Sequence, residues 1–226
     1  MINQVITAFN NAIFDTDKNA ALKIVHDALQ QGITPEDIVF KVVVPSIEYM
    51  STSISNDLGA SLAQHFMTAL IASLVTEEMI TRFTNPPEII GKMVIGTSPG
   101  DFHGLGKRIV IGCMKAQMID AVDLGLNVSP EKFVDEAVAH EAKVIGISSM
   151  MMHTARSKDG CLKVREILKQ RGLENKIKII VGGAPYRYDH NLYKIVQADA
   201  WAENGIEAGK VVTKLFSEVQ NDNRNG

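Results

Sequence analysis

Asp101 and His103 are the two side chains whose types and spacing best suit chemistry in this sequence. They stand two residues apart in a segment bounded by Gly100 and Gly104. In such a pair the carboxylate accepts a hydrogen bond from one imidazole nitrogen, and the other nitrogen points outward as a metal ligand. One histidine is too few for an ordinary zinc or iron site, which takes three or four protein ligands. A metal bound by His103 should therefore arrive already held by a macrocycle.

The elements that position this pair are short β-rich runs alternating with helical stretches. The helical stretches include residues 130–140 and 161–171. This alternation predicts an α/β domain with a five-stranded parallel, doubly wound sheet of the Rossmann or flavodoxin type, because each crossover must be right-handed and covers one sheet face. The five candidate strands are Lys92–Thr97, Ile119–Leu124, Val144–Ser148, Ile177–Val181 and Ala198–Trp201.

Three loops follow strands of this predicted sheet and contain the residues to consider for binding. They begin at Ser98, at Ser148-Ser149 and at Gly182-Gly183-Ala184-Pro185. Ligands of doubly wound sheets bind outside the carboxyl ends of the strands. We therefore expect these three loops, of which the first contains Asp101 and His103, to form one site.

The first 87 residues have helical rather than strand periodicity. Apolar residues recur at spacings of three and four from Ala21 to Leu29, and Gly32 ends that pattern. Thr34 and the proline after it are typical of a helix start, a third segment begins near Pro45, and a long one runs over 60–83. Four helices with short connections predict an N-terminal four-helix bundle.

The segment Thr84–Pro87 divides the two regions, since its two prolines forbid helix continuation. We predict a helical bundle over residues 1–87, an α/β domain over 88–226, and motion at the linker between them. Charge is also divided there: residues 1–88 have a net charge of −6 and the remainder has +3.

Composition excludes several classes of function. The chain has 226 residues, 46% hydrophobic and 22% charged, and a net charge of −3, which gives no electrostatic reason to expect nucleic acid or a membrane surface as partner. Cys113 and Cys161 form no CxxC pair, so neither a disulfide framework nor a cysteine zinc site is expected. No signal peptide is recognisable after Met1, and we expect a cytoplasmic protein.

Three motifs together resemble the cobalamin-binding fingerprint of methionine synthase and of the corrinoid proteins of methyltransferase systems. They are Asp101-x-His103-x-x-Gly106, Ser148-x-Met150 and Gly182-Gly183. The resemblance covers nearly the whole chain, because a helical bundle precedes the cobalamin domain in methyltransferase corrinoid proteins. Met150 stands where that family has leucine, and Met152 where it often has threonine.

The resemblance implies a role for each motif. His103 would be the lower axial ligand to cobalt in place of the benzimidazole of the cofactor, with Asp101 hydrogen-bonded to it. Gly106 would allow close approach of the corrin, Ser148 would contact the displaced nucleotide tail, and the glycine pair would leave room for that tail. The residues assigned to the cofactor are Asp101, Phe102, His103, Gly104, Gly106, Ser148, Met150, Met152, Gly182, Gly183 and Ala184.

The function implied by the resemblance is that of a non-catalytic corrinoid carrier. Cobalamin, as methylcobalamin in the loaded state, would shuttle a methyl group from a substrate-specific methyltransferase to a second methyltransferase that supplies a thiol or tetrahydrofolate. A reductive activase is a further expected partner. The helical bundle would act as a cap domain.

Other readings of the same residues remain open. A small subunit of an adenosylcobalamin-dependent mutase would need a separate substrate-binding barrel, and a cobalamin-sensing regulator would need a DNA-binding segment that is not evident. A flavin-binding module is an outsider, because Thr97-Ser98-Pro99-Gly100 faintly suggests a phosphate loop but does not account for Asp101 and His103. The run Met150–Met152 fits either flexible core filling or a tail pocket.

Overall fold

The computed structural model describes residues 1–55, 61–84 and 88–222, and it consists of two compact units. Residues 1–88 and 108–118 make up the first unit, and residues 89–107 and 119–226 make up the second. The division falls within helix α6 (Leu105–Ala116), whose first turn belongs to the second unit. The first unit is helical, and the second contains the sheet.

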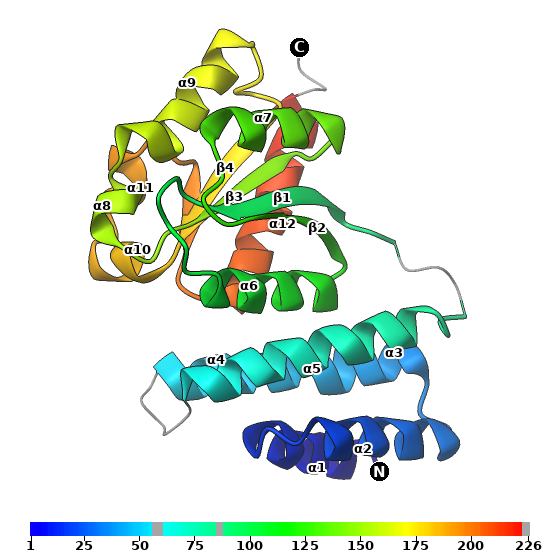
Figure 1. The fold of residues 1–226 in the computed structure, drawn as a ribbon. Coiled ribbons are helices and arrows are strands. Elements are labelled where there is room, and N and C mark those ends of the chain that lie inside the picture. Colours follow the sequence, from blue (N-terminus) through cyan, green and yellow to red (C-terminus); the bar gives the residue numbers. More distant parts are fainter. Residues whose placement is uncertain (56–60, 85–87, 223–226) are drawn as a thin grey trace. The chain divides into compact units, whose positions relative to one another are not determined.

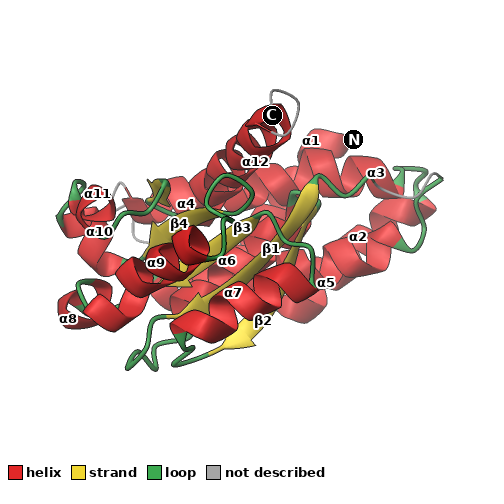
Figure 2. Ribbon diagram, turned by 90° about the horizontal axis from the view of Figure 1, so that it is seen from above, coloured by secondary structure: helices red, strands yellow, loops and turns green. Residues whose placement is uncertain are grey.

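A five-stranded sheet in the order β2-β1-β3-β4-β5 forms the second unit, and every neighbouring pair of strands is parallel (Figure 2). Each predicted strand is present, with bounds within two residues of those expected. The predicted parallel, doubly wound sheet is therefore confirmed. Its strands are β1 (Gly91–Thr97), β2 (Ile119–Gly125), β3 (Val144–Ser148), β4 (Lys178–Gly182) and β5 (Ala200–Ala202).

Helices α7 (Pro130–Ala139) and α9 (Lys163–Gln170) cover one face of the sheet, and α12 (Gly205–Asp222) lies on the other (Figure 1). Ser129 caps α7 by accepting a hydrogen bond from the Lys132 amide, as a serine before a first-turn proline predicts. The apolar side chains between the sheet and α7 and α9 form one buried cluster. It includes Val94, Phe133, Ile145, Ile147, Val164, Leu168, Ile179 and Val181.

Short helical segments carry the chain around the carboxyl edge of the sheet. One group follows β3 and another follows β4, so both groups lie next to the loops in which the sequence predicts a site. They are α8 (Met152–Ala155), the segment η2 (Lys158–Leu162), which is kinked at Gly160, α10 (Ala184–Tyr188) and α11 (Leu192–Ile195).

The N-terminal region is helical, as predicted, but its segments are divided differently. A helix that the periodicity did not single out occupies the first residues, and the segments expected from Thr34 and from Pro45 form one continuous helical run over residues 35–55. The elements are α1 (Ile2–Phe14), α2 (Lys18–Gln30), α3 (Pro35–Asp37), the π-helical segment η1 (Ile38–Val43), α4 (Val44–Ser55) and α5 (Leu62–Ile80).

The π-helical segment explains why Pro45 does not begin a separate helix. A proline in a helix lacks an N–H, and its ring collides with the carbonyl group four residues earlier. Just before Pro45 the helix widens, and the Val44 N–H donates to the carbonyl of Val39, five residues back. A wider turn relieves the collision, so the helix continues through the proline.

The linker predicted at Thr84–Pro87 lies mostly outside the described residues. Within the described part, the Thr84 N–H donates to Oε1 of Glu36 over 2.8 Å. The predicted motion at residues 85–87 therefore stays a prediction.

Candidate functional site

The site begins where three neighbouring strands end side by side. Thr97 of β1 pairs with Ser148 of β3, which in turn pairs with Gly182 of β4. The loops after these strands therefore start at one level on the carboxyl edge of the sheet. The structure thus brings the Asp101–His103 loop next to the segments that follow Ser148 and Gly182, as the sequence predicted.

A tight turn directs the first loop back across the sheet edge. The Asp101 N–H donates to the Ser98 carbonyl over 2.9 Å, Pro99 follows Ser98, and Gly100 has a φ of +76°. These are the features of a type II turn, in which proline presets the second position and glycine adopts the positive φ of the third. The turn delivers the Asp101 side chain into the protein.

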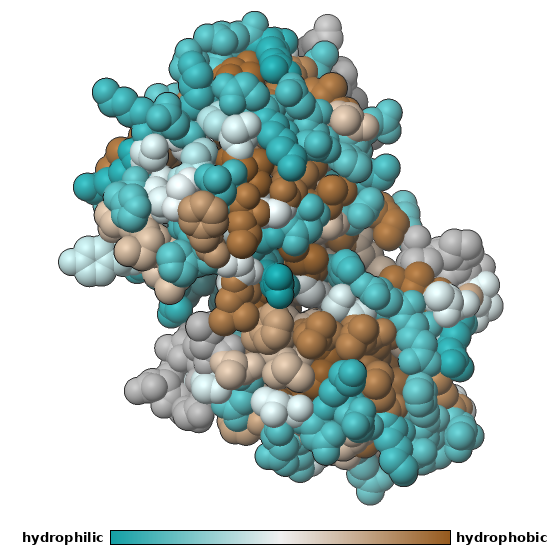
Figure 3. Space-filling view, viewed as in Figure 1, coloured by the Kyte–Doolittle hydropathy of each residue, from teal (hydrophilic) through white to brown (hydrophobic). Residues whose placement is uncertain are grey.

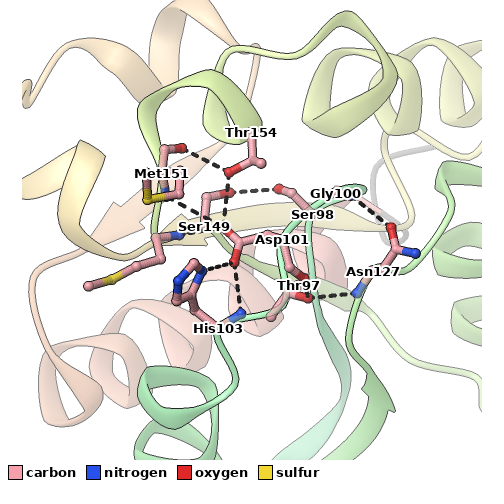
Figure 4. A network of polar contacts seen from close by, with 10 residues as sticks. Thr97, Ser98, Gly100, Asp101, His103, Asn127, Ser149, Met151 and Thr154 are labelled. Atoms are coloured by element: carbon pink, nitrogen blue, oxygen red, sulfur yellow. Dashed lines mark hydrogen bonds and ion pairs between the residues drawn. The ribbon is translucent and has the colours of Figure 1, made fainter.

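Asp101 is the centre of the polar network (Figure 4). Its side chain is fully buried, and Oδ2 accepts hydrogen bonds from the Met150 N–H (2.7 Å) and Thr154 Oγ1 (2.9 Å). Burial raises the pKa of the carboxyl group, but hydrogen bonds from the backbone of His103 and Met150 and from the side chains of His103 and Thr154 lower the pKa of Asp101 to about 2. The carboxylate is therefore ionised at neutral pH.

His103 is held by the other carboxylate oxygen. Its backbone N–H lies 3.0 Å and its ring Nδ1 2.9 Å from Oδ1 of Asp101. An ionised carboxylate only accepts hydrogen bonds, so Nδ1 is the donor of this contact, and in the neutral imidazole Nε2 is then the nitrogen with the lone pair. The His103 side chain is 57% exposed, and Nε2 has no partner among the described residues. The imidazole is thus oriented from within and presents one free nitrogen ligand.

Thr154 is the residue of this network that the sequence reasoning missed. It lies in α8, and its hydroxyl is 2.9 Å from Oδ2 of Asp101 and 2.8 Å from the Met151 carbonyl, so one proton serves two acceptors. The side chain is buried. In the sequence, only its position six residues after Ser148 could have pointed to Thr154. That position indicates a contact with Asp101 only once the fold of the segment after β3 is known.

The serine and methionine residues after β3 contribute in different ways. Ser148 is half-buried, and its carbonyl accepts the Ser98 N–H over 3.0 Å. Ser149, which the sequence did not assign to the site, is buried with its Oγ 2.6 Å from that of Ser98. Met150 is exposed at the rim, whereas Met152 packs partly buried against the core cluster. The partial burial of Met152 agrees with core filling, and its assignment to the cofactor stays a prediction.

Gly183 has a structural reason to be glycine. Its φ is +112°, and a Cβ there would lie 2.0 Å from the Ser149 carbonyl oxygen. The Ser149 N–H also donates to the Gly182 carbonyl over 3.0 Å. The glycine pair therefore lets the segment after β4 approach the segment after β3, and Ala184 follows as the exposed first residue of α10.

The far end of the His103 loop is open and largely apolar at its surface. Phe102 is 67% exposed, and a Cβ on Gly106 would meet no atom within 4 Å. A Cβ on Gly104 would lie 2.9 Å from the Leu126 side chain. The buried Lys107 ammonium then pairs with Asp123 of β2. Figure 3 shows apolar side chains reaching the surface of both units on the viewed face.

The donor set fits a metal that brings its own equatorial ligands. In the described part of the chain no three His, Cys, Asp or Glu side chains are grouped to hold a metal ion. His103 instead supplies a single nitrogen beside an open glycine and exposed Phe102 and Met150, which suits a flat macrocycle bound by one axial ligand.

Comparison with known families identifies that macrocycle. Residues 91–209, more than half of the chain, match the B12 binding domain family. The chain therefore belongs to this family, and cobalamin is its cofactor. The resemblance inferred from the three motifs is thereby confirmed.

Two similar proteins come from Methanosarcina mazei. "Trimethylamine corrinoid protein 2" is 26% identical over 97% of this chain and 92% of its own length. "Monomethylamine corrinoid protein 1" is 28% identical over 96% of this chain and its entire length.

Two solved structures share the fold. A cobalamin-binding protein from Desulfitobacterium hafniense superimposes with a TM-score of 0.74 at 21% identity, covering 93% of this chain and 98% of that one. The methanol:cobalamin methyltransferase complex from Methanosarcina barkeri contains a chain with a TM-score of 0.72 at 19% identity, covering 95% of this chain and 80% of that one.

Within the described residues, no helix is both long and apolar enough to cross a membrane.

Proposed function

We propose that this protein is a corrinoid carrier that binds cobalamin with His103 as the lower axial ligand and conveys a methyl group between two methyltransferases. The observation that carries the proposal is the network in which Asp101 fixes the His103 ring and leaves Nε2 free. The names of the similar proteins, corrinoid proteins for trimethylamine and monomethylamine, support the methyl-carrying role.

The residues of the chain bind and orient, and the cofactor supplies the reactivity. Bound cobalamin provides a cobalt atom that takes up and releases a methyl group. Asp101 keeps the proton on Nδ1 of His103, so that Nε2 stays available as a ligand. Thr154 and the Met150 N–H hold the carboxylate in place. With cobalamin bound, the exposed apolar side chains of Phe102 and Met150 would help to exclude water beside His103.

The nucleotide tail of cobalamin belongs beside Ser148 and Gly182 in this proposal. Both residues end their strands at the same level as Thr97, from which the His103 loop begins. These two half-buried strand ends would hold the nucleotide tail, as the motif resemblance implies. Residues 1–87 act as the cap domain and residues 88–226 as the cofactor domain.

The partners in this proposal are enzymes. A substrate-specific methyltransferase supplies the methyl group, and a second methyltransferase delivers it to a thiol or to tetrahydrofolate. A reductive activase is a further partner in this proposal. Methylamines are the first donors to test, since two of the similar proteins carry methylamine names.

A transfer assay tests the proposed function. The full chain is reconstituted anaerobically with hydroxocobalamin, passed over a gel-filtration column, reduced and mixed with a methylamine methyltransferase and radiolabelled substrate. We expect cobalamin to co-elute with the protein and the label to pass to the bound corrinoid and then to a thiol once an acceptor methyltransferase is added. The assay is repeated with a panel of methylamine methyltransferases. The proposal would be contradicted if cobalamin were lost on the column, or if it stayed bound but received label from none of these enzymes.

A further inference from the structure

Asn127 contacts the His103 loop at Gly100, away from the side on which Thr154 lies (Figure 4). It lies in the loop between β2 and α7, and its side chain is exposed. Its side-chain Oδ1 accepts the Gly100 N–H over 2.7 Å. Asn127 therefore holds the third residue of the turn that leads into Asp101.

The backbone of Asn127 holds the same loop a second time. Its N–H lies 2.8 Å from Thr97 Oγ1 and 3.1 Å from the Asp101 carbonyl oxygen. The Thr97 hydroxyl donates in turn to that carbonyl over 2.6 Å. The main chain of Asp101 is thus fixed by β1 and by the loop after β2, while its carboxylate is fixed by the segment after β3.

Asn127 adopts an unusual backbone conformation to make these contacts. Its φ is +52°, in the left-handed region that asparagine tolerates better than most residues with a side chain. Such a conformation costs free energy and persists when surrounding contacts determine it. Because the side chain is exposed, packing of apolar surface does not account for this backbone conformation. The contacts of Asn127 to Thr97, Gly100 and Asp101 account for it.

We propose that Asn127 is a positioning residue for the axial histidine: by fixing the turn from Ser98 to Asp101, it sets the direction in which His103 presents Nε2. The inference rests on the proposed function, in which His103 ligates cobalt. Asn127 forms no hydrogen bond with the imidazole, whose partner is Asp101. It acts through Gly100 and the main chain of Asp101, which supports the carboxylate that holds the ring.

Three variants separate this role from a general effect on folding. Asn127→Gly keeps the left-handed backbone without strain and removes the exposed side chain, including the amide oxygen that accepts the Gly100 N–H. Asn127→Asp keeps an acceptor at the same place and is the conservative rescue. Glu141→Gly is the matched control, because Glu141 also has a positive φ, of +56°, but follows the C-cap residue of α7, at the opposite edge of the sheet.

Two measurements are made on the full chain. In the cobalamin-free protein, hydrogen exchange of the Gly100 amide reports whether the contact exists. In the reconstituted Co(II) form, electron paramagnetic resonance (EPR) reports the ratio of corrinoid coordinated by a protein histidine to corrinoid that is not. Loss of one hydrogen bond of about 1 kcal/mol predicts an approximately fivefold fall in this ratio for Asn127→Gly. Asn127→Asp and Glu141→Gly should match the wild type.

The outcomes distinguish the inference from the proposed function. If the wild type shows histidine coordination and Asn127→Gly shows the same ratio despite faster Gly100 exchange, Asn127 is only structural and the inference is wrong. Equal falls in Asn127→Gly and Glu141→Gly would also reject it. If the wild type shows no histidine coordination, the proposed role of His103 fails first, and the role assigned to Asn127 fails with it.

Discussion

The Oδ1 atom of Asp101 contacts both the main-chain N–H and the ring Nδ1 of His103, at 3.0 and 2.9 Å. Two contacts to one atom fix the ring relative to its own backbone, so the imidazole has little freedom to rotate. The buried carboxylate carries the negative charge, and the exposed imidazole carries the free lone pair. In the proposed function, Asp101 would therefore set the direction from which His103 binds cobalt without contacting the metal itself.

Thr154→Val should weaken the hold on Asp101. The substitution keeps the volume but removes the hydroxyl 2.9 Å from Oδ2, so we expect the pKa of Asp101 to rise and the free energy of unfolding to fall by about 1 kcal/mol. Carboxyl resonances in NMR titrations of the cobalamin-free protein measure the pKa, and urea denaturation measures the stability. Thr154→Ser retains the hydroxyl and serves as the control. An identical Asp101 pKa in all three proteins would show that the contact has no energetic role.

The stability of the cobalamin-free protein should depend on pH through Asp101. Its pKa of about 2 in the folded protein lies below the ordinary value of an unfolded aspartate. The carboxylate therefore stabilises the fold above about pH 4, by about 2 kcal/mol, and this contribution is lost as the pH falls toward about 2. The difference in unfolding free energy between the wild type and Asp101→Asn should shrink over that range in urea titrations. A difference that stays constant with pH would contradict this assignment.

Gly106→Ala should lower cobalamin affinity without lowering stability. A Cβ at this position meets no protein atom within 4 Å, and alanine favours the start of α6 more than glycine does. If the corrin approaches this point, the methyl group obstructs it, and we expect affinity to fall about tenfold, or about 1.4 kcal/mol. Thermal unfolding and cobalamin titration measure the two quantities.

Gly183→Ala provides the contrast for that experiment. Its Cβ would lie 2.0 Å from the Ser149 carbonyl, so the cobalamin-free protein itself should lose stability. If Gly106→Ala bound cobalamin as tightly as the wild type, Gly106 would not be part of the cofactor site.

The sheet and its site edge could be predicted from the sequence because the signals are local. Runs such as Val144–Ser148 are apolar and short, and each is followed by residues that favour turns. Parallel strands then place the loops after Thr97, Ser148 and Gly182 together without further information. The pairing of Asp101 with His103 was predictable for the same reason, since the two residues are separated by one position.

The remainder of the site depends on contacts between distant segments. Thr154 reaches Asp101 across 53 positions of sequence, and Asn127 reaches Gly100 across 27. Neither residue has a spacing that marks it, and the positive φ of Asn127 follows from those contacts rather than from its neighbours. In the helical region, Pro45 indicated a boundary that the π-helical segment before it removes. Local preference was overridden there by the continuation of the helix.

The measurement that most directly tests the account is the EPR spectrum of the Co(II) form reconstituted with protein in which histidine carries the heavy nitrogen isotope. If Nε2 of His103 is the coordinating atom, as we propose, the isotope changes the axial nitrogen splitting. The change should persist in His140→Ala, which removes an exposed imidazole beside Glu136, and disappear in His103→Ala. A splitting that the isotope does not alter would show that the nitrogen belongs to the cofactor's own base and would contradict the central claim.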